Sequence, residues 1–283
     1  MNSILMREEI ARFLKEDIGA QDLASEIIFS KEDYSKGTWV CKEPGIAAGL
    51  EVVKEGYRFI SPDIKVTFFV REGEEMKKGQ TIGEVEGPVQ LLLSGERVML
   101  NLFQRMSGIA TLTAQAVSKL SEGKTRVCDT RKTTPGLRMF EKEAVRVGGG
   151  FNHRFGLYDA VMVKDNHIKA AGGISKAIEK VRKHVGPTVK VEVEATNQKE
   201  IEEAVVSGAD IIMFDNFTPE EIERTISLVP SSILTEASGG INLSNLDKYS
   251  QCGVDFISMG CLTHSAPSLD ISFNLEVKAY ELS

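Results

Sequence analysis

Hydrophobic and polar positions follow helical and strand-like patterns in turn through the amino-terminal part of the chain. Apolar residues fall on one face of predicted helices over 3–15 and 49–59, the first with Ser3 as its N-cap. Short apolar runs over 37–42 and 64–70 predict strands around the second helix. A long amphipathic helix is predicted over 95–120, and it leads into a second domain.

Strands and helices alternate regularly after this helix. Thr218, Pro219 and Glu221 supply the N-cap, first-turn proline and capping-box acid of one predicted helix, and Gly208 and Gly253 stand where helices end. The apolar runs that predict strands cover 125–131, 159–164, 189–194, 210–215, 233–236 and 255–260. This alternation predicts a parallel sheet.

Most of these predicted strands end at a charged residue. The strands end at Arg131, Lys164, Glu194, Asp215 and Glu236, with Ser258 and Gly260 closing the last. Apolar runs that end in charges resemble an α/β barrel, whose chemistry gathers at the carboxyl ends of the strands. An open doubly wound sheet is the alternative, and it also binds ligands at these ends. Either architecture therefore predicts one shared site.

A cluster of cations interrupts a chain whose formal net charge is -7. Its members in segment 129–168 include Arg131, Lys132, His153, Arg154 and Lys164. With a Debye length of about 8 Å at physiological salt, distant surface acids are screened, whereas cations that line one cavity act together. We expect a small anionic ligand. By contrast, Arg138, Lys142 and Arg146 are spaced by four residues on a predicted helix and are expected to form a solvated face.

Composition and spacing exclude several other classes of protein. Charged residues appear by Arg7, and no apolar run reaches the length of a membrane span, so we expect a cytoplasmic protein that binds no membrane. The cysteines form no C-x-x-C pair and have no histidine at metal-ligand spacing, which argues against a disulfide framework or structural zinc. A compact basic cluster also argues against extended nucleic-acid binding.

Two further features suit phosphate groups. The turn Ser238-Gly239-Gly240 directly follows its strand and can direct backbone N–H groups at a phosphate, as can Gly260 with the next turn. Arg97 lies at the start of the predicted helix over 95–120, where the helix terminus and the cation both attract anions. For His167 and His264, packing and ligand contact remain open.

The motifs, taken in order, resemble those of the quinolinate phosphoribosyltransferase family. They are DTRKTTPG, GGGFNHR, KDNH, VEVE, Asp215-Asn216-Phe217, EASGG and GCLTHSAPSLDIS, preceded by Glu96-Arg97 and SGIATLT. The resemblance extends over nearly the whole chain. It implies an α/β fold with an N-terminal α/β sandwich domain over 1–103, to which 267–283 returns, and an incomplete α/β barrel with parallel strands over 104–266.

The resemblance also implies the reaction. Members of the family transfer the phosphoribosyl group of phosphoribosyl pyrophosphate to quinolinate with decarboxylation, giving nicotinate mononucleotide, pyrophosphate and CO2 in de novo NAD biosynthesis. They use Mg2+ and need no redox or pyridoxal cofactor. They work as homodimers or multiples of dimers with shared active sites.

Site residues follow from the same resemblance. The substrate-binding set is Arg97, Thr130, Arg131, Lys132, His153, Arg154, Lys164, Glu194, Asp215, Ser238, Gly239, Gly240, Ser258, Met259 and Gly260. The resemblance assigns the quinolinate carboxylates to Arg131, His153, Arg154 and Lys164, and the 5′-phosphate to the glycine turns. Arg97 enters from the neighbouring subunit. The catalytic residues are Lys132, near the phosphates, Lys164, Glu194 and Asp215, of which the two acids bind ribose and, directly or through water, Mg2+.

Other functions are compatible with the same residues. A nicotinate phosphoribosyltransferase would bind a monocarboxylate, and a relative associated with molybdenum transport shares much of the pattern. Lys164 at a strand end would also suit a Schiff base, as in aldolases. A phosphate-binding module without turnover is a third class.

Overall fold

A computed structural model of the chain describes residues 1–120 and 123–276, which divide into two compact units. The first comprises Met1–Leu112, Thr134–Gly148 and the described part of Ala266–Ser283. The second comprises Gly149–Ser265 and the described part of Thr113–Thr133. In the described residues, no helix has the length and apolar character needed to cross a membrane.

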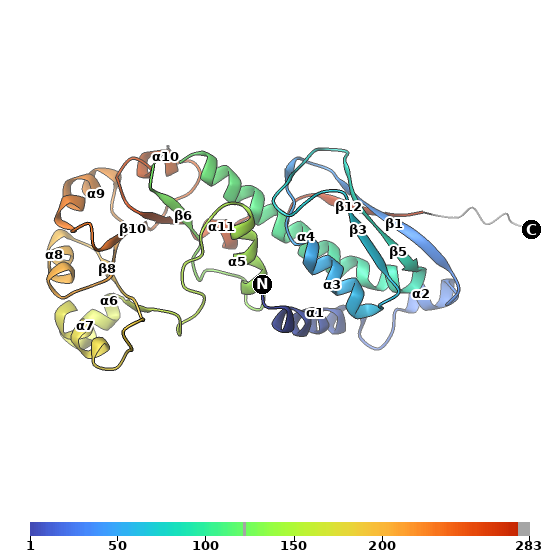
Figure 1. The fold of residues 1–283 in the computed structure, drawn as a ribbon, viewed down its shortest axis with the longest axis horizontal. Coiled ribbons are helices and arrows are strands. Elements are labelled where there is room, and N and C mark those ends of the chain that lie inside the picture. Colours follow the sequence, from blue (N-terminus) through green and yellow to red (C-terminus); the bar gives the residue numbers. More distant parts are fainter. Residues whose placement is uncertain (121–122, 277–283) are drawn as a thin grey trace, which may run out of the picture. The chain divides into compact units, whose positions relative to one another are not determined.

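The first unit is built on an antiparallel sheet with the strand order β12-β1-β5-β3. Its strands are β1 (Tyr34–Cys41), β3 (Lys65–Phe68), β5 (Thr81–Pro88) and β12 (Ile271–Leu275), beside a small pair formed by β2 (Gly45–Ile46) and β4 (Glu75–Met76). β12 and β1 come from opposite ends of the chain and lie side by side (Figure 1). Part of the predicted carboxyl-terminal segment, 277–283, lies outside the described residues.

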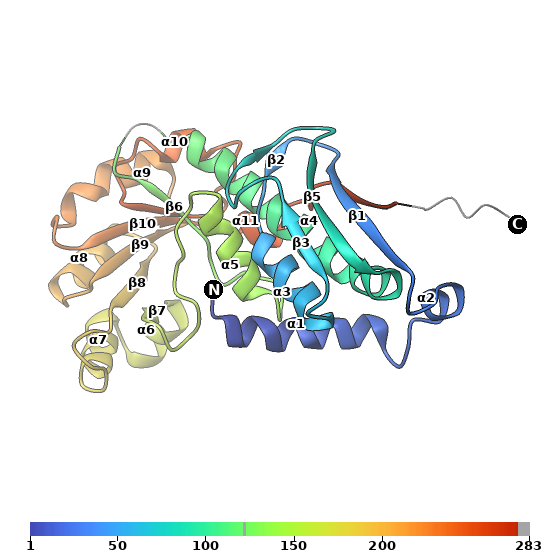
Figure 2. The ribbon, with the colours of Figure 1, turned by 45° about the vertical axis from the view of Figure 1, so that its right-hand side comes forward.

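Helix α3 (Leu50–Ile60) and the first part of α4 (Val89–Ser118) cover one face of this sheet (Figure 2), and α1 (Ser3–Ile18) packs on α3. The unit also contains α2 (Leu23–Ile28) and α5 (Arg138–Val147). Figure 2 shows α3 and α4 running across the sheet. Trp39 is buried and stacks on Phe68 of the same sheet with ring centroids 5.2 Å apart, and its ring lies 6.1 Å from that of Tyr57 on α3, so aromatic packing fills the space between sheet and helix.

Three details of the first unit correct the sequence predictions. Asn2, not Ser3, caps α1, because its Oδ1 accepts the backbone N–H groups of Ile4 and Leu5. α4 begins at Val89 instead of residue 95, so Arg97 lies inside the helix and not at its start. Lys142 is 1% exposed because α5 packs on more than one side, and it therefore does not belong to a solvated face.

The second unit contains the predicted parallel sheet, which the structure confirms. Its six strands have the order β6-β11-β10-β9-β8-β7. Their bounds are β6 (Arg126–Cys128), β7 (Val161–Val163), β8 (Val191–Ala195), β9 (Ile211–Asp215), β10 (Leu234–Ser238) and β11 (Phe256–Ser258). β6, the first strand of this unit, pairs with β11, the last, as in a barrel. In a doubly wound sheet, the order of the strands would instead reverse at a point within the sheet. Because β6 and β7 stand at opposite ends of the order, the described barrel is incomplete.

The outer side of this sheet carries short helices (Figures 1 and 2). They include α7 (Ile174–Arg182), α8 (Gln198–Val206), α9 (Pro219–Thr225) and α10 (Leu246–Tyr249). In the chain, α6 (Asp165–Ala171) precedes α7, the 3-10 turn η1 (Ile226–Leu228) follows α9, and α11 (Cys261–His264) follows β11. The capping box of Thr218 and Glu221 opens α9 as predicted, with Pro219 in its first turn. Glu236 corrects another prediction: β10 continues to Ser238, so Glu236 lies within the strand and not at its end.

Candidate active site

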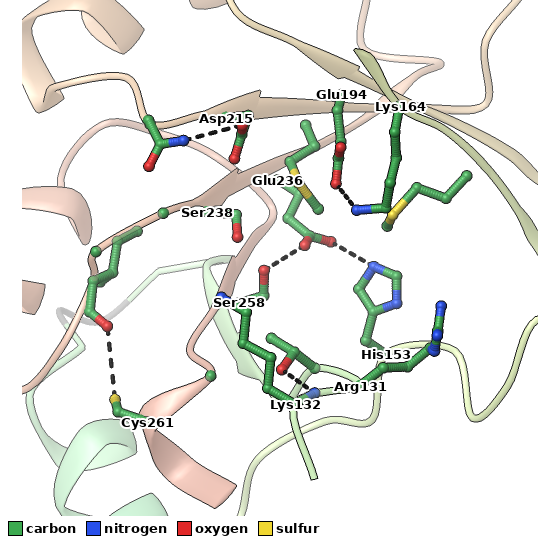
Figure 3. A pocket seen from close by; sticks show the side chains of 18 of the residues that line it. Arg131, Lys132, His153, Lys164, Glu194, Asp215, Glu236, Ser238, Ser258 and Cys261 are labelled. Carbon is green, nitrogen blue, oxygen red and sulfur yellow. Dashed lines mark hydrogen bonds and ion pairs between the residues drawn. The ribbon is translucent and has the colours of Figure 1, made fainter. Parts of the chain in front are cut away.

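A cavity of about 720 Å³ opens at the carboxyl ends of the parallel strands, and all of its lining residues belong to the second unit. The predicted site residues in its lining are Thr130, Arg131, Lys132, His153, Arg154, Lys164, Glu194, Asp215, Ser238, Gly239, Gly240, Ser258 and Gly260. Figure 3 shows their side chains converging from different strands. The parallel sheet thus brings together cations and carboxylates that are far apart in sequence.

Lys164 and Glu194 form an ion pair in this cavity. Lys164 is the residue between β7 and α6, and its ammonium group meets the carboxylate of Glu194 on the neighbouring strand β8 (Figure 3). The two side chains are 42% and 16% exposed, respectively. A ligand anion reaching Lys164, or a ligand cation reaching Glu194, therefore competes with a bond that is already present.

Buried Asp129 anchors the loop that carries two of the predicted anion ligands. Its carboxylate accepts the side-chain amide of Asn152 at 2.7 Å and the backbone N–H of His153 at 2.9 Å. The next residue, Arg154, donates to the backbone oxygen of Ala160 at 3.1 Å. Burial and the nearby charge of Arg131 lower the pKa of Arg154 from its ordinary value. The positive charges of Arg131 and Arg154 influence each other, and together they attract an anion into this part of the cavity.

His153 lies between two buried carboxylates. Its Nε2 is 3.1 Å from Glu192 and 3.4 Å from Glu236. Burial acts to lower the pKa of His153, but the hydrogen bonds and charges of both carboxylates outweigh it and raise the pKa to about 10. The backbone N–H of Arg154 donates to Nδ1 at 2.7 Å, a contact that favours the neutral ring with its proton on Nε2 and so opposes the two carboxylates, which favour the charged ring. In either protonation state, Nε2 carries the proton that faces the two acids.

Asp215, at the end of β9, is oriented by its neighbour. Asn216 Nδ2 donates to the Asp215 carboxylate at 3.0 Å, while the Asn216 backbone N–H donates to the oxygen of Ser238 at 2.8 Å. Asn216 has φ 59°, the left-handed conformation that asparagine tolerates better than most residues. A Cβ at Gly239 would stand 2.2 Å from Asn216 Oδ1, so glycine permits this close approach.

Further glycines line the cavity. Gly240 has φ 64°, which is compatible with a tight turn directly after β10. A Cβ at Gly260 would lie 2.9 Å from Cδ of Lys132, so glycine here lets the lysine stem pass close to the backbone. The hydroxyl of Thr263 donates to the backbone oxygen of Lys132 at 2.8 Å and fixes this strand connection.

Two predicted site residues lie outside this lining. Met259 is fully buried and does not line the cavity. Arg97 belongs to the first unit, where its side chain is 59% exposed and 3.8 Å from Glu96. The two undecided histidines differ: His264 lines the cavity, whereas His167 accepts the backbone N–H of Lys164 through Nδ1 and caps α6.

The sequence analysis did not assign several lining residues to the site. They are Met162, Met213, Asn216, Glu236, Ile241, Asn242 and Cys261. Glu236 was expected only as a strand end. Strand alternation was a usable signal for buried Glu192, because it stands two residues before Glu194 on β8 and so points to the same face.

Two sets of acids in the second unit offer metal ligands. Glu194 and Asp215, on neighbouring strands, present oxygen atoms alone to the cavity, which is the donor type that Mg2+ prefers. His153, Glu192 and Glu236 form a different group whose ligand atoms lie within 4.8 Å of one another. The predicted Mg2+ residues therefore fit that ion by their chemistry.

Comparison with known proteins covers nearly the whole chain. Residues 22–107 match the family described as quinolinate phosphoribosyl transferase, N-terminal domain, and residues 109–274 match its C-terminal domain. The chain is 48% identical over 275 residues to the probable nicotinate-nucleotide pyrophosphorylase (carboxylating) of Bacillus subtilis (strain 168), covering 97% of this chain and 95% of that protein. It is 41% identical over 271 residues to the nicotinate-nucleotide pyrophosphorylase (carboxylating) of Homo sapiens, covering 94% and 90% respectively.

A solved structure gives the same result for the fold. NadC from Streptococcus pyogenes superposes with a TM-score of 0.93 at 39% sequence identity, and the match covers 98% of both chains. The predicted α/β fold class is therefore confirmed.

Proposed function

The chain belongs to the quinolinate phosphoribosyltransferase family, and we propose that its cavity carries out the reaction for which the family is named. The enzyme transfers the phosphoribosyl group of phosphoribosyl pyrophosphate to quinolinate with loss of CO2. The products are nicotinate mononucleotide, pyrophosphate and CO2, and the pathway is NAD biosynthesis.

One observation supports this proposal above the others: cations and carboxylates from separate segments of the chain line a single cavity. Arg131, Arg154 and Lys164 supply positive charge, and Glu194 and Asp215 supply negative charge. The carboxylates of the acid substrate need cations, whereas the ribose hydroxyl groups of the phosphorylated sugar need carboxylates. Each hydrogen bond between a charged side chain and an ionic ligand contributes about 1.5 to 3 kcal/mol, so a few such contacts hold a small dianion firmly.

We assign the acid substrate to the side of the cavity formed by Arg131, His153, Arg154 and Lys164. The two guanidinium groups offer paired N–H donors that match carboxylate geometry. Lys164 gives up its ion pair with Glu194 when a substrate carboxylate arrives, which leaves Glu194 available to the sugar. A monocarboxylate would fill only part of this side and would leave a cation without its partner.

We assign phosphoribosyl pyrophosphate to the remaining sides. Glu194 and Asp215 receive the ribose hydroxyl groups and hold Mg2+, directly or through water, while Lys132 approaches the phosphates. When bound, Mg2+ supplies positive charge that stabilises the departing pyrophosphate. Ser238, Gly239, Gly240 and Gly260 surround the 5′-phosphate with backbone N–H groups.

These assignments fit the charges that develop during the reaction. As pyrophosphate leaves C1′ of the sugar, the ring gains positive character, which the carboxylates of Glu194 and Asp215 stabilise. The pyridine nitrogen then forms a bond to C1′ and becomes cationic. The bond to the C2 carboxylate breaks, CO2 leaves, and the electron pair stays on C2 beside the cationic nitrogen. C2 then takes up a proton from water, which gives nicotinate mononucleotide. The cavity acts chiefly by positioning, which can contribute about 7 to 11 kcal/mol.

We further propose that the enzyme works as a dimer or a multiple of dimers, with Arg97 entering the site of the neighbouring subunit. The exposed position of Arg97 on α4 leaves its side chain accessible to a second copy. A cytoplasmic location is part of the same proposal, and cell fractionation tests it.

The test is a turnover assay with purified protein, phosphoribosyl pyrophosphate and Mg2+. We expect quinolinate to give equal amounts of pyrophosphate and CO2, and nicotinate to give neither. Pyrophosphate release with nicotinate but not quinolinate would replace the proposed substrate. Inactivation at Lys164 by borohydride in the presence of a carbonyl substrate would instead indicate Schiff-base chemistry.

A further inference from the structure

Two buried glutamates stand behind the cationic side of the cavity, and the mechanism above gives them no role. Glu192 on β8 is 2% exposed and Glu236 on β10 is 3% exposed. Both direct a carboxylate oxygen at Nε2 of His153, at 3.1 and 3.4 Å. Figure 3 shows the His153 ring turned toward Glu236.

The carboxylates are themselves fixed in different ways. The hydroxyl of Ser258, 3% exposed, donates to the second oxygen of Glu236 at 2.5 Å. Its hydroxyl is therefore engaged with Glu236 although Ser258 lines the cavity. The other oxygen of Glu192 is buried and makes no hydrogen bond within the part of the chain that the structure describes. In the described part of the chain, His153 is the ion-pair partner that orients the Glu192 carboxylate.

Burying these two carboxylates lowers the stability of the fold. Burial raises the pKa of Glu192, because the charged form loses its water, and the nearby Glu236 acts in the same direction. Apolar side chains of similar volume usually serve a core as well as a buried ionic group or better. A site that keeps two buried acids around one imidazole therefore points to a requirement for orientation.

The orientation of the His153 imidazole also fixes the position of the neighbouring residue, Arg154. His153 Nδ1 accepts the backbone N–H of Arg154, while the backbone N–H of His153 donates to Asp129. With both ends of the ring held, the chain at Arg154 has little freedom to turn. The Arg154 guanidinium can then face the cavity without an ordering step when the acid binds.

We propose that Glu192 and Glu236 are positioning residues that hold His153, and through it Arg154, in the arrangement that recognises the dicarboxylate substrate. This inference rests on the proposed function, because it concerns the acid side of the same cavity. It predicts that removing either carboxylate weakens quinolinate binding selectively, since the sugar-phosphate side does not depend on His153. A divalent cation bound by His153, Glu192 and Glu236 is the competing explanation.

The kinetic test compares Glu192→Gln with Asp255→Asn as a matched control. The glutamine keeps the volume of Glu192 but removes its charge. Asp255 is another acid of the second unit, partly buried where Glu192 is fully buried; its carboxylate accepts hydrogen bonds from Thr235 and Lys124 and does not line the cavity. For Glu192→Gln we expect the KM for quinolinate to rise by about 10- to 100-fold, because a hydrogen bond to a charged group that orients His153 is lost. The KM for phosphoribosyl pyrophosphate should stay within about twofold. The control should lower stability and leave both KM values near wild type.

A double-mutant cycle separates positioning from general packing. If Glu192 acts through His153, Glu192→Gln should add little to the quinolinate KM of a His153→Ala variant. The proposal would be overturned if the two substitutions raised the KM for quinolinate independently, so that their fold-changes multiplied. It would also be overturned if the Asp255→Asn control showed the same selective rise in the KM for quinolinate. Stoichiometric divalent metal in the wild-type protein that is lost in Glu192→Gln would also overturn it.

A measurement without substrate keeps this inference distinct from the proposed reaction. The chain has four histidines, so the ring N–H signals can be assigned by NMR. We expect an Nε2–H signal of His153 that exchanges slowly with water in the wild type and rapidly in Glu192→Gln. Absence of turnover with quinolinate would refute the proposed function, whereas rapid exchange in the wild type would refute the positioning role.

Discussion

Asn216 provides a test in which backbone and side-chain effects can be separated. Its φ of 59° places it in the left-handed region, and its amide group donates to Asp215 at 3.0 Å. Asn216→Gly removes the side chain but accepts the backbone conformation without strain. Asn216→Ala removes the same hydrogen bond and adds the steric cost of the left-handed conformation.

The expected magnitudes follow from these two contributions. A hydrogen bond to a charged group contributes about 1.5 to 3 kcal/mol, and because Asn216 is exposed we take about 1 kcal/mol. The left-handed conformation costs an alanine about 1 kcal/mol more. The free energy of unfolding should therefore fall by about 1 kcal/mol in Asn216→Gly and by about 2 kcal/mol in Asn216→Ala.

The effect on activity should differ from the effect on stability. Both variants lose the contact that orients the Asp215 carboxylate, so both should lose about tenfold in kcat/KM for phosphoribosyl pyrophosphate. Urea unfolding and initial rates of pyrophosphate release provide the two measurements. Equal stability of the two variants would refute the backbone argument. An unchanged kcat/KM in Asn216→Gly would refute the orienting role of the side chain.

Three further predictions address the acid subsite, the dimer and access to the cavity. Arg131→Ala should abolish quinolinate binding in calorimetry and spare phosphoribosyl pyrophosphate; undiminished quinolinate affinity would remove Arg131 from the acid side. Mixing Arg97→Ala and Lys164→Ala subunits should restore part of the activity in verified heterodimers if the site is shared, and no recovery would exclude Arg97 from the neighbour's site. Cys261 lines the cavity and is the least buried cysteine, while burial raises its thiol pKa, so its thiolate fraction at pH 8 is lower than in an ordinary cysteine. Maleimide should label it slowly, faster as the pH rises, and phosphoribosyl pyrophosphate should protect it, with Cys261→Ser as the unlabelled control.

The parallel half of the fold was predictable because local signals agree with one another there. Each strand is an apolar run, and stop and start signals such as Gly208 and the Thr218 capping box separate the helices. The carboxyl-end rule then placed residues such as Lys164, Glu194 and Asp215 on one cavity, as the structure has them.

The remaining features depend on contacts between distant segments. The helix α2 is too short to show a helical period, and β12 forms by pairing with β1 at the other end of the chain. The burial of Lys142 and the environment of His153 arise in the same way, because strands far apart in sequence supply the two carboxylates. No local pattern contains that information.

The most direct test of the proposed reaction follows the carboxyl carbons of quinolinate. Two substrates, labelled with 13C at the C2 or the C3 carboxylate, are incubated with the enzyme, phosphoribosyl pyrophosphate and Mg2+. We expect labelled CO2 from the C2 substrate alone, one for each pyrophosphate released and none without phosphoribosyl pyrophosphate. Label released from the C3 carboxylate, or CO2 formed without the sugar donor, would contradict a cavity that joins the pyridine nitrogen to C1′ before the carboxylate departs.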